Sequence, residues 1–501
     1  MRKLKRSIIE IALAFSYILI NQSNATGEIL ESSNANIEKW QKIAAKDIQR
    51  AQEIIKEAHP ASLDYSNQDF HNWLYAGYEK ALIYAQKSKS KDQAWAALNF
   101  YTTGFMDEHL RVWRDSPNTV DLHWVGWNME YRNEKFLVVS AAEKWPKELP
   151  KIGDEVVSCD GLAIIDYLKR DIAPFVDRRV GLTNTLNKLA KYITEEQPKN
   201  TLWNSSRSIN CEFKTPAGSR KTLEMHWEKK SNNQEIKNSI IPRKGIRQIE
   251  PHIYWIHISN FMLDAKDHLD FEALLNKIRM LSSADAVVLD TRGNSGGNSL
   301  IGTRLIYALL KESMPAQENS TALWRISSQA KATLESHRHS AMQTEGSDGF
   351  VYKFLSDLIE SMKLASIRGE NFVEQISTSI EKDENSAKNT RPFKGKIVLI
   401  TDSNCGSSCL NFVDEVMQIP GTLHVGNTTS ADTRYTDVAT VALPSGAKLW
   451  VPLKVWIGRR RQDNIPYVPE IAFDGDLNDT NALQAWILDS ILPHAKAIGM
   501  P

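Results

Sequence analysis

The chain has 501 residues, too many for one ordinary domain, and this length predicts roughly two to four domains. Hydrophobic residues make up 42% of the chain and charged residues 24%, which is typical of a soluble globular protein with sizeable cores. Because 61 basic residues balance 61 acidic ones, the formal net charge is zero, which argues against nucleic acid or an anionic membrane as the main partner.

Residues 1–25 are predicted to be a signal peptide. Residues 1–6 (MRKLKR) are basic, residues 7–20 are mostly apolar, and Ala25 ends a small-residue motif of the kind that a signal peptidase reads. A membrane anchor is disfavoured because the apolar run is short and contains Glu10. We therefore expect an exported protein, periplasmic or secreted, with no stable membrane span after cleavage.

The next two regions differ in their periodicity. Residues 26–116 carry aromatic and aliphatic side chains at helical spacing, which predicts an N-terminal helical domain with these side chains in its core. Residues 117–235 carry short alternating or β-branched runs, which predict a small β-rich domain. Within it, residues 153–161 (GDEVVSCDG) predict a strand that ends at a tight Asp-Gly turn.

Residues 236–501 alternate between apolar strand-like runs and helix-like patterns. This alternation predicts an α/β core with a mainly parallel sheet and flanking helices. Residues 313–389 are polar and mostly helical, and they predict an insertion between two core strands. Such an insertion could be a lid, a partner surface or a solvated spacer.

Two turns of the predicted core carry the main chemical signal. Residues 290–298 (DTRGNSGGN) and 404–409 (NCGSSC) each follow an apolar strand-like run and each lead into a helix-like pattern. A turn between a strand and a helix leaves backbone N–H groups free and can expose one side chain. Taken singly, the first turn could hold a phosphate, although the Lys-Ser/Thr ending is missing, and the second could be a simple helix cap.

Taken together, the two turns predict an acyl-transfer site. Ser407 at the start of a helix can act as the nucleophile, with the N–H of Ser408 pointing the same way. Gly296 or Gly297 can supply the second half of an oxyanion hole, because a glycine lets the backbone approach a substrate carbonyl. Asp290 and Arg292 would pair and hold that turn.

Four cysteines allow three pairings in an exported protein. They are Cys159, Cys211, Cys405 and Cys409. A bridge between the last two would span a single helical turn around Ser407, and the alternative is that all four stay reduced. No CxxC pair or matching histidine cluster accompanies them, so we expect no metal site.

The chain resembles the tail-specific (C-terminal processing) serine protease family over roughly residues 109–479. Residues 287–297 resemble its hydrophobic-D-x-R-x-N-x-GG block. Residues 398–410 resemble its nucleophile block, with Ser407 at the serine, and residues 426–429 (GNTT) resemble its G-E-x-T block. The resemblance implies an exported serine-type peptidase with peptide or protein substrates and no metal or nucleotide cofactor.

The β-rich region fits the same family. Residues 153–161 resemble the GD-x-I-x-x-x-DG element of PDZ domains, and family members carry a PDZ-like domain before or within the protease core. A PDZ domain binds an extended peptide by strand addition at a sheet edge. The alternative is an unrelated small β-rich domain.

The lysine base of the Ser-Lys members is missing at its usual place. Asp432 stands shortly after residues 426–429, where those members have a lysine. Lys448 and Lys454 remain as displaced candidates, but both lie in strand-like runs that favour a structural role.

The tricorn-like branch of the family uses a histidine instead. Residues 106–110 (MDEHL) resemble its D-G-H element and make His109 the general base, with a packed structural histidine as the alternative. Residues 462–470 (QDNIPYVPE) resemble its E-N-x-G-x-x-P-D element and make Asp463 the acid that orients the base. The alternative for Asp463 is a solvated loop acid that pairs with Arg459 or Arg461.

The predicted function is thus hydrolysis of peptide bonds by Ser407 with His109 as its base. One alternative is a catalytically inactive peptide-binding protein on the same fold, which the degraded motif after Ser407 would favour. Another alternative is an esterase that uses the same serine, because acyl transfer to water does not require an amide.

Overall fold

The computed structural model describes residues 34–115, 122–197, 202–204, 207–208, 210–230, 245–262, 267–310, 320–375 and 393–493. The predicted signal peptide lies outside the described residues, as do both ends of the predicted insertion. Within the described part of the chain, no helix combines the length and the apolar character that a membrane span needs.

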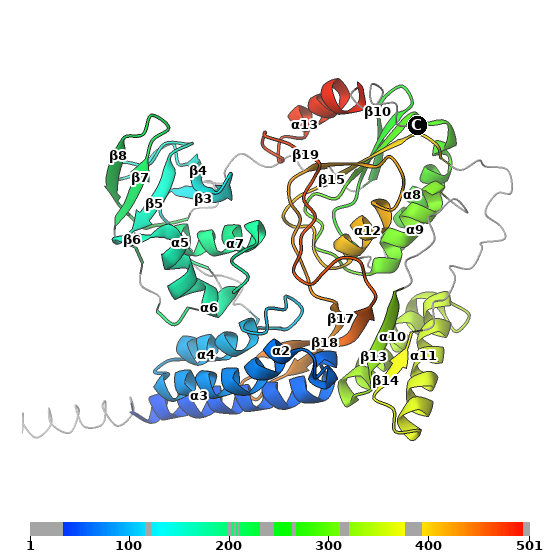
Figure 1. Ribbon diagram of the computed structural model, residues 1–501, viewed down its shortest axis with the longest axis horizontal. Coiled ribbons are helices and arrows are strands. Elements are labelled where there is room, and N and C mark those ends of the chain that lie inside the picture. Colours follow the sequence, from blue (N-terminus) through cyan, green and yellow to red (C-terminus); the bar gives the residue numbers. More distant parts are fainter. Residues whose placement is uncertain are drawn as a thin grey trace, which may run out of the picture.

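The N-terminal region is helical, as predicted. Figure 1 shows its helices in blue beside the strands β17 and β18. The elements are a helix over residues 34–58, η1 (Pro60–Leu63), α2 (Gln68–Asn72), η2 (Trp73–Gly77), α3 (Tyr78–Lys87) and α4 (Lys91–Thr103). Ser90 caps α4 by accepting a hydrogen bond from the N–H of Gln93, which satisfies one of the free donors of the first turn.

These helices pack on a five-stranded antiparallel sheet with the order β1-β18-β13-β14, in which β17 also pairs with β18. Its strands are β1 (Arg111–Trp113), β13 (Thr321–Arg325), β14 (Phe372–Glu374), β17 (Tyr435–Ala442) and β18 (Lys448–Ile457). Helices and sheet share one hydrophobic core, which includes Ile48 from the first helix and Leu449 and Val451 from β18. The sheet therefore joins three segments that are remote in sequence.

The insertion predicted at residues 313–389 is part of this packed unit. It supplies β13 and β14 together with the helices α10 (Ser328–Glu345) and α11 (Phe350–Ile367). Leu334 and Leu358 lie in the shared core, and Glu57 of the first helix accepts a hydrogen bond from the N–H of Ser328 at 3.1 Å. The spacer interpretation is wrong for the described part of the insertion, because its apolar side chains are buried here.

The β-rich region forms a sheet of its own with the order β3-β4-β5-β7-β8, and β6 pairs with β5. The strands are β3 (Trp127–Arg132), β4 (Lys135–Ala141), β5 (Glu155–Cys159), β6 (Leu162–Ala163), β7 (Asn210–Lys214) and β8 (Arg220–Glu224). Helical segments pack on it: α5 (Ile164–Tyr167), η3 (Leu168–Ile172), α6 (Ala173–Val176) and α7 (Thr183–Thr194). A small ribbon of β2 (His123–Trp124) and β9 (Glu228–Lys229) lies at the entry and exit of this region.

The α/β core is confirmed. Its six-stranded sheet has the order β10-β11-β12-β15-β16-β19, and all pairings are parallel except that of β10 with β11. The strands are β10 (Gly245–Glu250), β11 (Ile253–His257), β12 (Ala286–Asp290), β15 (Lys396–Thr401), β16 (Leu423–Gly426) and β19 (Ile471–Ala472). Val288 and Val398 on the central strands are fully buried, as expected for a parallel sheet covered on both faces.

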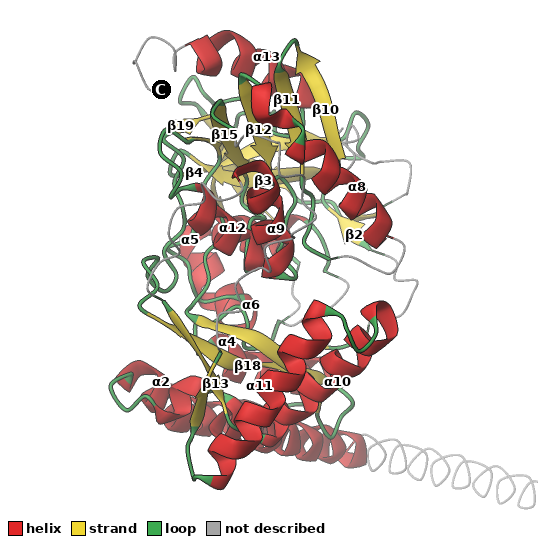
Figure 2. Ribbon diagram, turned by 90° about the vertical axis from the view of Figure 1, so that its right-hand side faces the viewer, coloured by secondary structure: helices red, strands yellow, loops and turns green. Residues whose placement is uncertain are grey.

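Helices cover both faces of this parallel sheet. Figure 2 shows α8, α9 and α12 on one side and α13 on the other. Their bounds are α8 (Asp267–Arg279), η5 (Leu281–Ser283), α9 (Ser299–Leu310), α12 (Ser408–Val416), α13 (Thr480–Trp486) and η7 (Ile487–Ile491). The turn before α9 and the turn before α12 both start from the carboxyl ends of neighbouring strands, β12 and β15.

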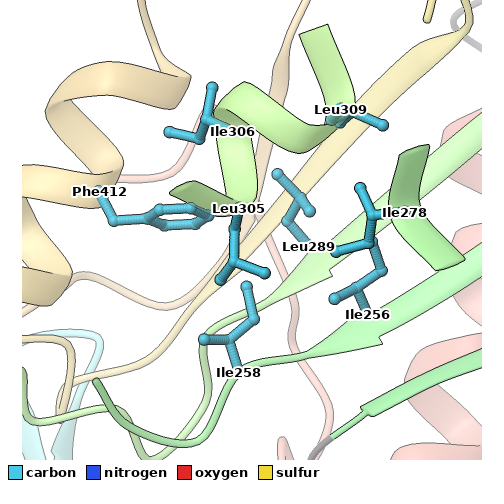
Figure 3. A pocket seen from close by; sticks show the side chains of 8 residues that line it. All are labelled: Ile256, Ile258, Ile278, Leu289, Leu305, Ile306, Leu309 and Phe412. Atoms are coloured by element: carbon cyan, nitrogen blue, oxygen red, sulfur yellow. The ribbon is translucent and has the colours of Figure 1, made fainter. Parts of the chain in front are cut away.

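A small cavity lies within this layer and is not a binding site. It measures about 10 Å³ and is lined by apolar side chains from the sheet, α8, α9 and α12 (Figure 3). The lining residues are Ile256, Ile258, Ile278, Leu289, Leu305, Ile306, Leu309 and Phe412. An apolar space of this size offers a water molecule no hydrogen bond, so it is an imperfection of packing.

Candidate active site

Ser407 occupies a strained turn between β15 and α12. Its backbone has φ 54° and ψ −124°, and it is the N-cap residue of α12 without a capping hydrogen bond from its side chain. A positive φ costs energy in any residue other than glycine, and such strain is found where a side chain must be presented for function. The geometry resembles a nucleophile elbow and disagrees with a simple helix cap.

His109 lies beside this serine. Its Nε2 is 3.1 Å from Ser407 Oγ, although the two residues are 298 positions apart in sequence. His109 is placed by β1, which begins at Arg111 and pairs with β18. The His109 side chain is only 12% exposed, so the ring faces the serine from a largely buried position. The structure thus brings together the predicted nucleophile and the predicted base.

The glycine turn touches the nucleophile turn directly. Gly296 has φ +101°, and a Cβ added to it would lie 2.8 Å from Gly406 O and 2.9 Å from Ser407 Cβ. Gly297 has φ +135°, and an added Cβ would lie 2.3 Å from Phe261 O. Both positions therefore require glycine, for the backbone angle and for the space.

Of the three backbone N–H groups predicted for the oxyanion hole, one is already engaged. The N–H of Gly296 donates to Asn294 Oδ1 at 2.9 Å, so it is already engaged. The N–H groups of Gly297 and Ser408 make no hydrogen bond with any described residue. Ser408 Oγ donates to Gly297 O at 2.6 Å and ties the turns together. The predicted oxyanion hole is thereby reduced to Gly297 and Ser408, and Gly296 has a steric role.

A buried ion pair holds the glycine turn, as predicted. Arg292 donates from Nε and from one terminal nitrogen to the two oxygens of Asp290, at 2.9 and 2.7 Å. Trp255 Nε1 donates to the same carboxylate at 3.0 Å. Burial alone would raise the pKa of Asp290, but hydrogen bonds from His257 and Arg292 outweigh it and hold the pKa well below its usual range.

Asp463 lies apart from His109. Its oxygens accept hydrogen bonds from the N–H and the Nε of Arg434 at 2.7 and 2.8 Å, and Arg459 lies 3.5 Å away. Among the described residues it makes no hydrogen bond or ion pair with His109. Its role as the orienting acid is therefore not supported, because two arginines compete for its carboxylate, and the loop-acid alternative describes it.

The acidic residue at the usual lysine position is structural. Asp432 is buried and binds Arg461 and Arg459. Lys454 is buried against Asp437, with 2.5 Å between Nζ and the carboxylate. Lys448 lies 3.3 Å from Asp115. Each lysine is thus held by a carboxylate on or beside the antiparallel sheet, as a structural role predicts.

Two residues next to His109 were missed in the sequence. Asp107 Oδ1 accepts a hydrogen bond from the backbone N–H of His109 at 2.9 Å and lies 3.8 Å from His109 Nδ1. His59 Nε2 lies 3.5 Å from the other oxygen of Asp107. Asp107 stands in the MDEHL motif and could have been assigned from it, whereas nothing in the sequence links His59 to this site.

The β-rich domain also reaches the site through Arg179, which is buried. One terminal nitrogen of Arg179 lies 2.5 Å from Glu108, the residue before His109, and the other donates to Ala431 O at 2.8 Å. From the same domain, Asn184 donates to Ser430 Oγ at 2.8 Å, and Ser430 borders Gly406 of the nucleophile turn. This domain therefore contacts both the base and the nucleophile side of the site.

Comparisons with known proteins concern the core sequence and the overall fold. The sequence model of peptidase family S41 matches residues 252–466. The search of curated proteins found no match. The crystal structure of mature CPAF is similar, with a TM-score of 0.61 and 13% sequence identity, covering 86% of this chain and 93% of CPAF. A CPAF mutant gives a TM-score of 0.62 at 13% identity, covering 90% and 97%. The chain thus shares its fold with CPAF, and its core matches a peptidase family.

Proposed function

Because residues 252–466 match peptidase family S41, we propose that this serine peptidase uses Ser407 as its nucleophile and His109 as its general base. The observation that carries the assignment is the 3.1 Å distance between His109 Nε2 and Ser407 Oγ. A hydrogen bond of this length lets the imidazole take the hydroxyl proton as the oxygen attacks.

The remaining groups suit the steps that follow. As Ser407 Oγ attacks a peptide carbonyl, the N–H groups of Gly297 and Ser408 can bind the oxyanion of the tetrahedral intermediate. His109 then gives its proton to the leaving amine, which leaves an acyl group on Ser407. His109 then takes a proton from a water molecule as that water attacks the ester. The proton passes from His109 to Ser407 Oγ as the acyl group leaves, and the free serine is restored.

Export is part of the proposal. The basic and apolar N-terminal residues support it, and so do two disulfides, between Cys159 and Cys211 and between Cys405 and Cys409. Such bonds persist in oxidising compartments and are rare in reducing ones. N-terminal sequencing of the mature protein should find a chain that begins at Thr26, and an intact Met1 would contradict export with cleavage.

The β-rich domain is proposed to be a PDZ-like module that holds the peptide substrate. The edge strand β3 lies beside α7, and Asn187 of α7 accepts a hydrogen bond from the N–H of Tyr131 at 2.5 Å. A peptide that added a strand to β3 would have to displace this contact. Deleting the Asn187 side chain is therefore expected to tighten peptide binding to β3 and to lower KM. A higher KM in Asn187→Ala would argue against peptide binding between β3 and α7.

Activity-based labelling tests the catalytic assignment. Ser407→Ala should lose both fluorophosphonate labelling and hydrolysis of an unfolded protein substrate, without unfolding the chain. His109→Ala should lose most of the activity, and Lys454→Met should keep it. Full activity in His109→Ala would contradict the histidine assignment and favour a lysine as the general base. If Ser407 is not labelled but the protein still binds peptide, the protein is an inactive binder. If it hydrolyses esters but not peptides, it is an esterase.

A further inference from the structure

Three buried atoms behind His109 have no hydrogen-bond partner. They are His109 Nδ1, Asp107 Oδ2 and His59 Nε2. Nearly all buried polar atoms in folded proteins are paired, so three adjacent exceptions call for an explanation. His109 Nδ1 lies 3.8 Å from Asp107 Oδ1, and Asp107 Oδ2 lies 3.5 Å from His59 Nε2. Both gaps are slightly longer than a hydrogen bond, and hydrogen bonds of active sites are often long before substrate binds.

The proton of His59 is directed at Asp107. His59 Nδ1 accepts a hydrogen bond from the N–H of Ala61 at 3.1 Å, so the neutral ring carries its proton on Nε2. Burial lowers the pKa of His59, which keeps the ring neutral. The ring is held between Phe70 and Tyr435, with 4.7 Å between centroids on each side. His59 is therefore a fixed donor that faces a carboxylate.

Asp107 is an ionised acceptor in this place. Burial would raise its pKa, but the nearby His59 and His109 outweigh burial, so that the pKa lies below its usual range. The side chain is 3% exposed, and the contact of Oδ1 with the N–H of His109 fixes its direction. A buried charge of this kind is stable only where donors surround it.

The other charges near this cluster do not substitute for Asp107. Arg179 adds positive charge beside Asp107, but its guanidinium is bound by Asp177 and Glu108. Asp437 on β17 acts on His109 electrostatically, and its carboxylate is bound by Lys454. Of the described carboxylates, Asp107 is the one that lies within 4.0 Å of the His109 ring nitrogens.

We propose that Asp107 and His59 are positioning residues that complete a series Ser407–His109–Asp107–His59, in the role that the sequence assigned to Asp463. This inference rests on the proposed function. When His109 takes the Ser407 proton on Nε2, it keeps the proton on Nδ1 and becomes an imidazolium. Asp107 moves closer by about 0.6 to 1.1 Å and accepts a hydrogen bond from Nδ1–H, while His59 holds its second oxygen. No proton leaves His109 toward Asp107, and His59 stays neutral throughout.

Four variants test the series, each measured as kcat and KM across pH. Asp107→Asn keeps the shape but removes the charge, and it should lower kcat by about 10³- to 10⁴-fold with KM unchanged, as loss of the orienting acid does in other hydrolases. The acid limb of its kcat/KM profile should move to lower pH, because His109 loses the carboxylate that favours its protonated form. A purely structural defect would not move that limb.

His59 is tested by a matched pair. His59→Leu removes the donor and should lower kcat by about tenfold, the loss expected for one buried hydrogen bond. His59→Gln places an amide N–H near the former Nε2 and should recover most of that loss. Asp463→Asn is the control, and its kcat should stay within about twofold of the wild type, because its hydrogen bonds and ion pairs with described residues are with Arg434 and Arg459.

The failures are distinguishable. Labelling of the wild type by fluorophosphonate supports the proposed function. If Asp463→Asn then lowers kcat by about 10³- to 10⁴-fold, the loss expected for Asp107→Asn, the series is overturned and the proposed function stands. The series is likewise overturned if Asp107→Asn retains its kcat, or if His59→Leu and His59→Gln fall equally without a change in the pH profile. A wild type that neither labels nor hydrolyses peptide overturns the proposed function, and the series with it.

Discussion

The disulfide that brackets Ser407 is expected to matter for activity more than for stability. Cys405 and Cys409 are fully buried, lie four positions apart and enclose the turn in which Ser407 has φ 54°. Cys159 and Cys211 form the natural control, since they are equally buried but 52 positions apart and join β5 to β7. The perturbation is the double change to alanine in each pair.

The magnitudes follow from the two loop lengths. Closing a short loop of this size in the unfolded chain accounts for ~2 kcal/mol of stability, and closing the long one accounts for ~4 kcal/mol. For the backbone strain at Ser407, a cost of about 1–3 kcal/mol is typical. If the bridge is what opposes relaxation of that strain, its loss should lower the population of productive turns, and kcat, by about 10- to 100-fold.

The assay is urea unfolding together with kcat, KM and the rate of fluorophosphonate labelling. The pair Cys405→Ala/Cys409→Ala should lose more activity and less stability than the pair Cys159→Ala/Cys211→Ala. An unchanged labelling rate in Cys405→Ala/Cys409→Ala would refute the reasoning, because the turn would then keep its strained conformation without the disulfide. Equal activity losses in both pairs would show that global destabilisation, rather than the local turn, controls activity.

Two further changes test the turns and the helices behind them. Gly296→Ala places a Cβ 2.8 Å from Gly406 O at φ +101°, so it should displace Ser407 and lower kcat by at least about 100-fold. Gly446→Ala is its control, because Gly446 has φ +86° with nothing within 4 Å, and it should cost stability alone, about 1 kcal/mol. Burial raises the pKa of Glu415 on α12 to about 7, while Thr303 of α9 donates to it at 2.8 Å. Because the folded pKa lies above the unfolded one, this contribution to stability is present at pH 4 and lost as pH rises through 7. Glu415→Gln should therefore raise the free energy of unfolding at pH 8 by ~1–3 kcal/mol, seen as a higher urea midpoint than that of the wild type. At pH 4 the two midpoints should be equal, and equal midpoints at pH 8 would contradict the reasoning.

The local parts of the site were predictable from the sequence because each is carried by one short segment. The Gly296-Gly297 turn, Ser407 and the Asp290–Arg292 pair follow from a buried strand, a turn and a helix that are adjacent in the chain. His109 was predictable only through its resemblance to a family motif. That motif also contains Asp107 at the aspartate of the D-G-H element, so the same resemblance could have pointed to it.

The other parts depend on contacts between remote segments. Asp463 fits the family motif, but its carboxylate is bound by Arg459 of its own loop and by Arg434, which lies 29 positions earlier in the chain. His59 lies 48 positions before Asp107 and meets it only because the N-terminal helices pack on the antiparallel sheet. Likewise, β13 and β14 could not be paired with β18 from periodicity alone, because a strand-like pattern does not name its partner.

The arrangement of the cores explains why this site forms only in the complete fold. His109 enters β1 of the antiparallel sheet, whose core includes the N-terminal helices, whereas Ser407 stands between β15 and α12 of the parallel sheet, which has a separate core. Neither core alone contains both reacting atoms. Arg179, from the third domain, binds Glu108 on one side and Ala431 on the other. The 3.1 Å contact between base and nucleophile is thus set by the packing of three units against one another, and a change that loosens any one of them should reduce kcat before it unfolds the chain.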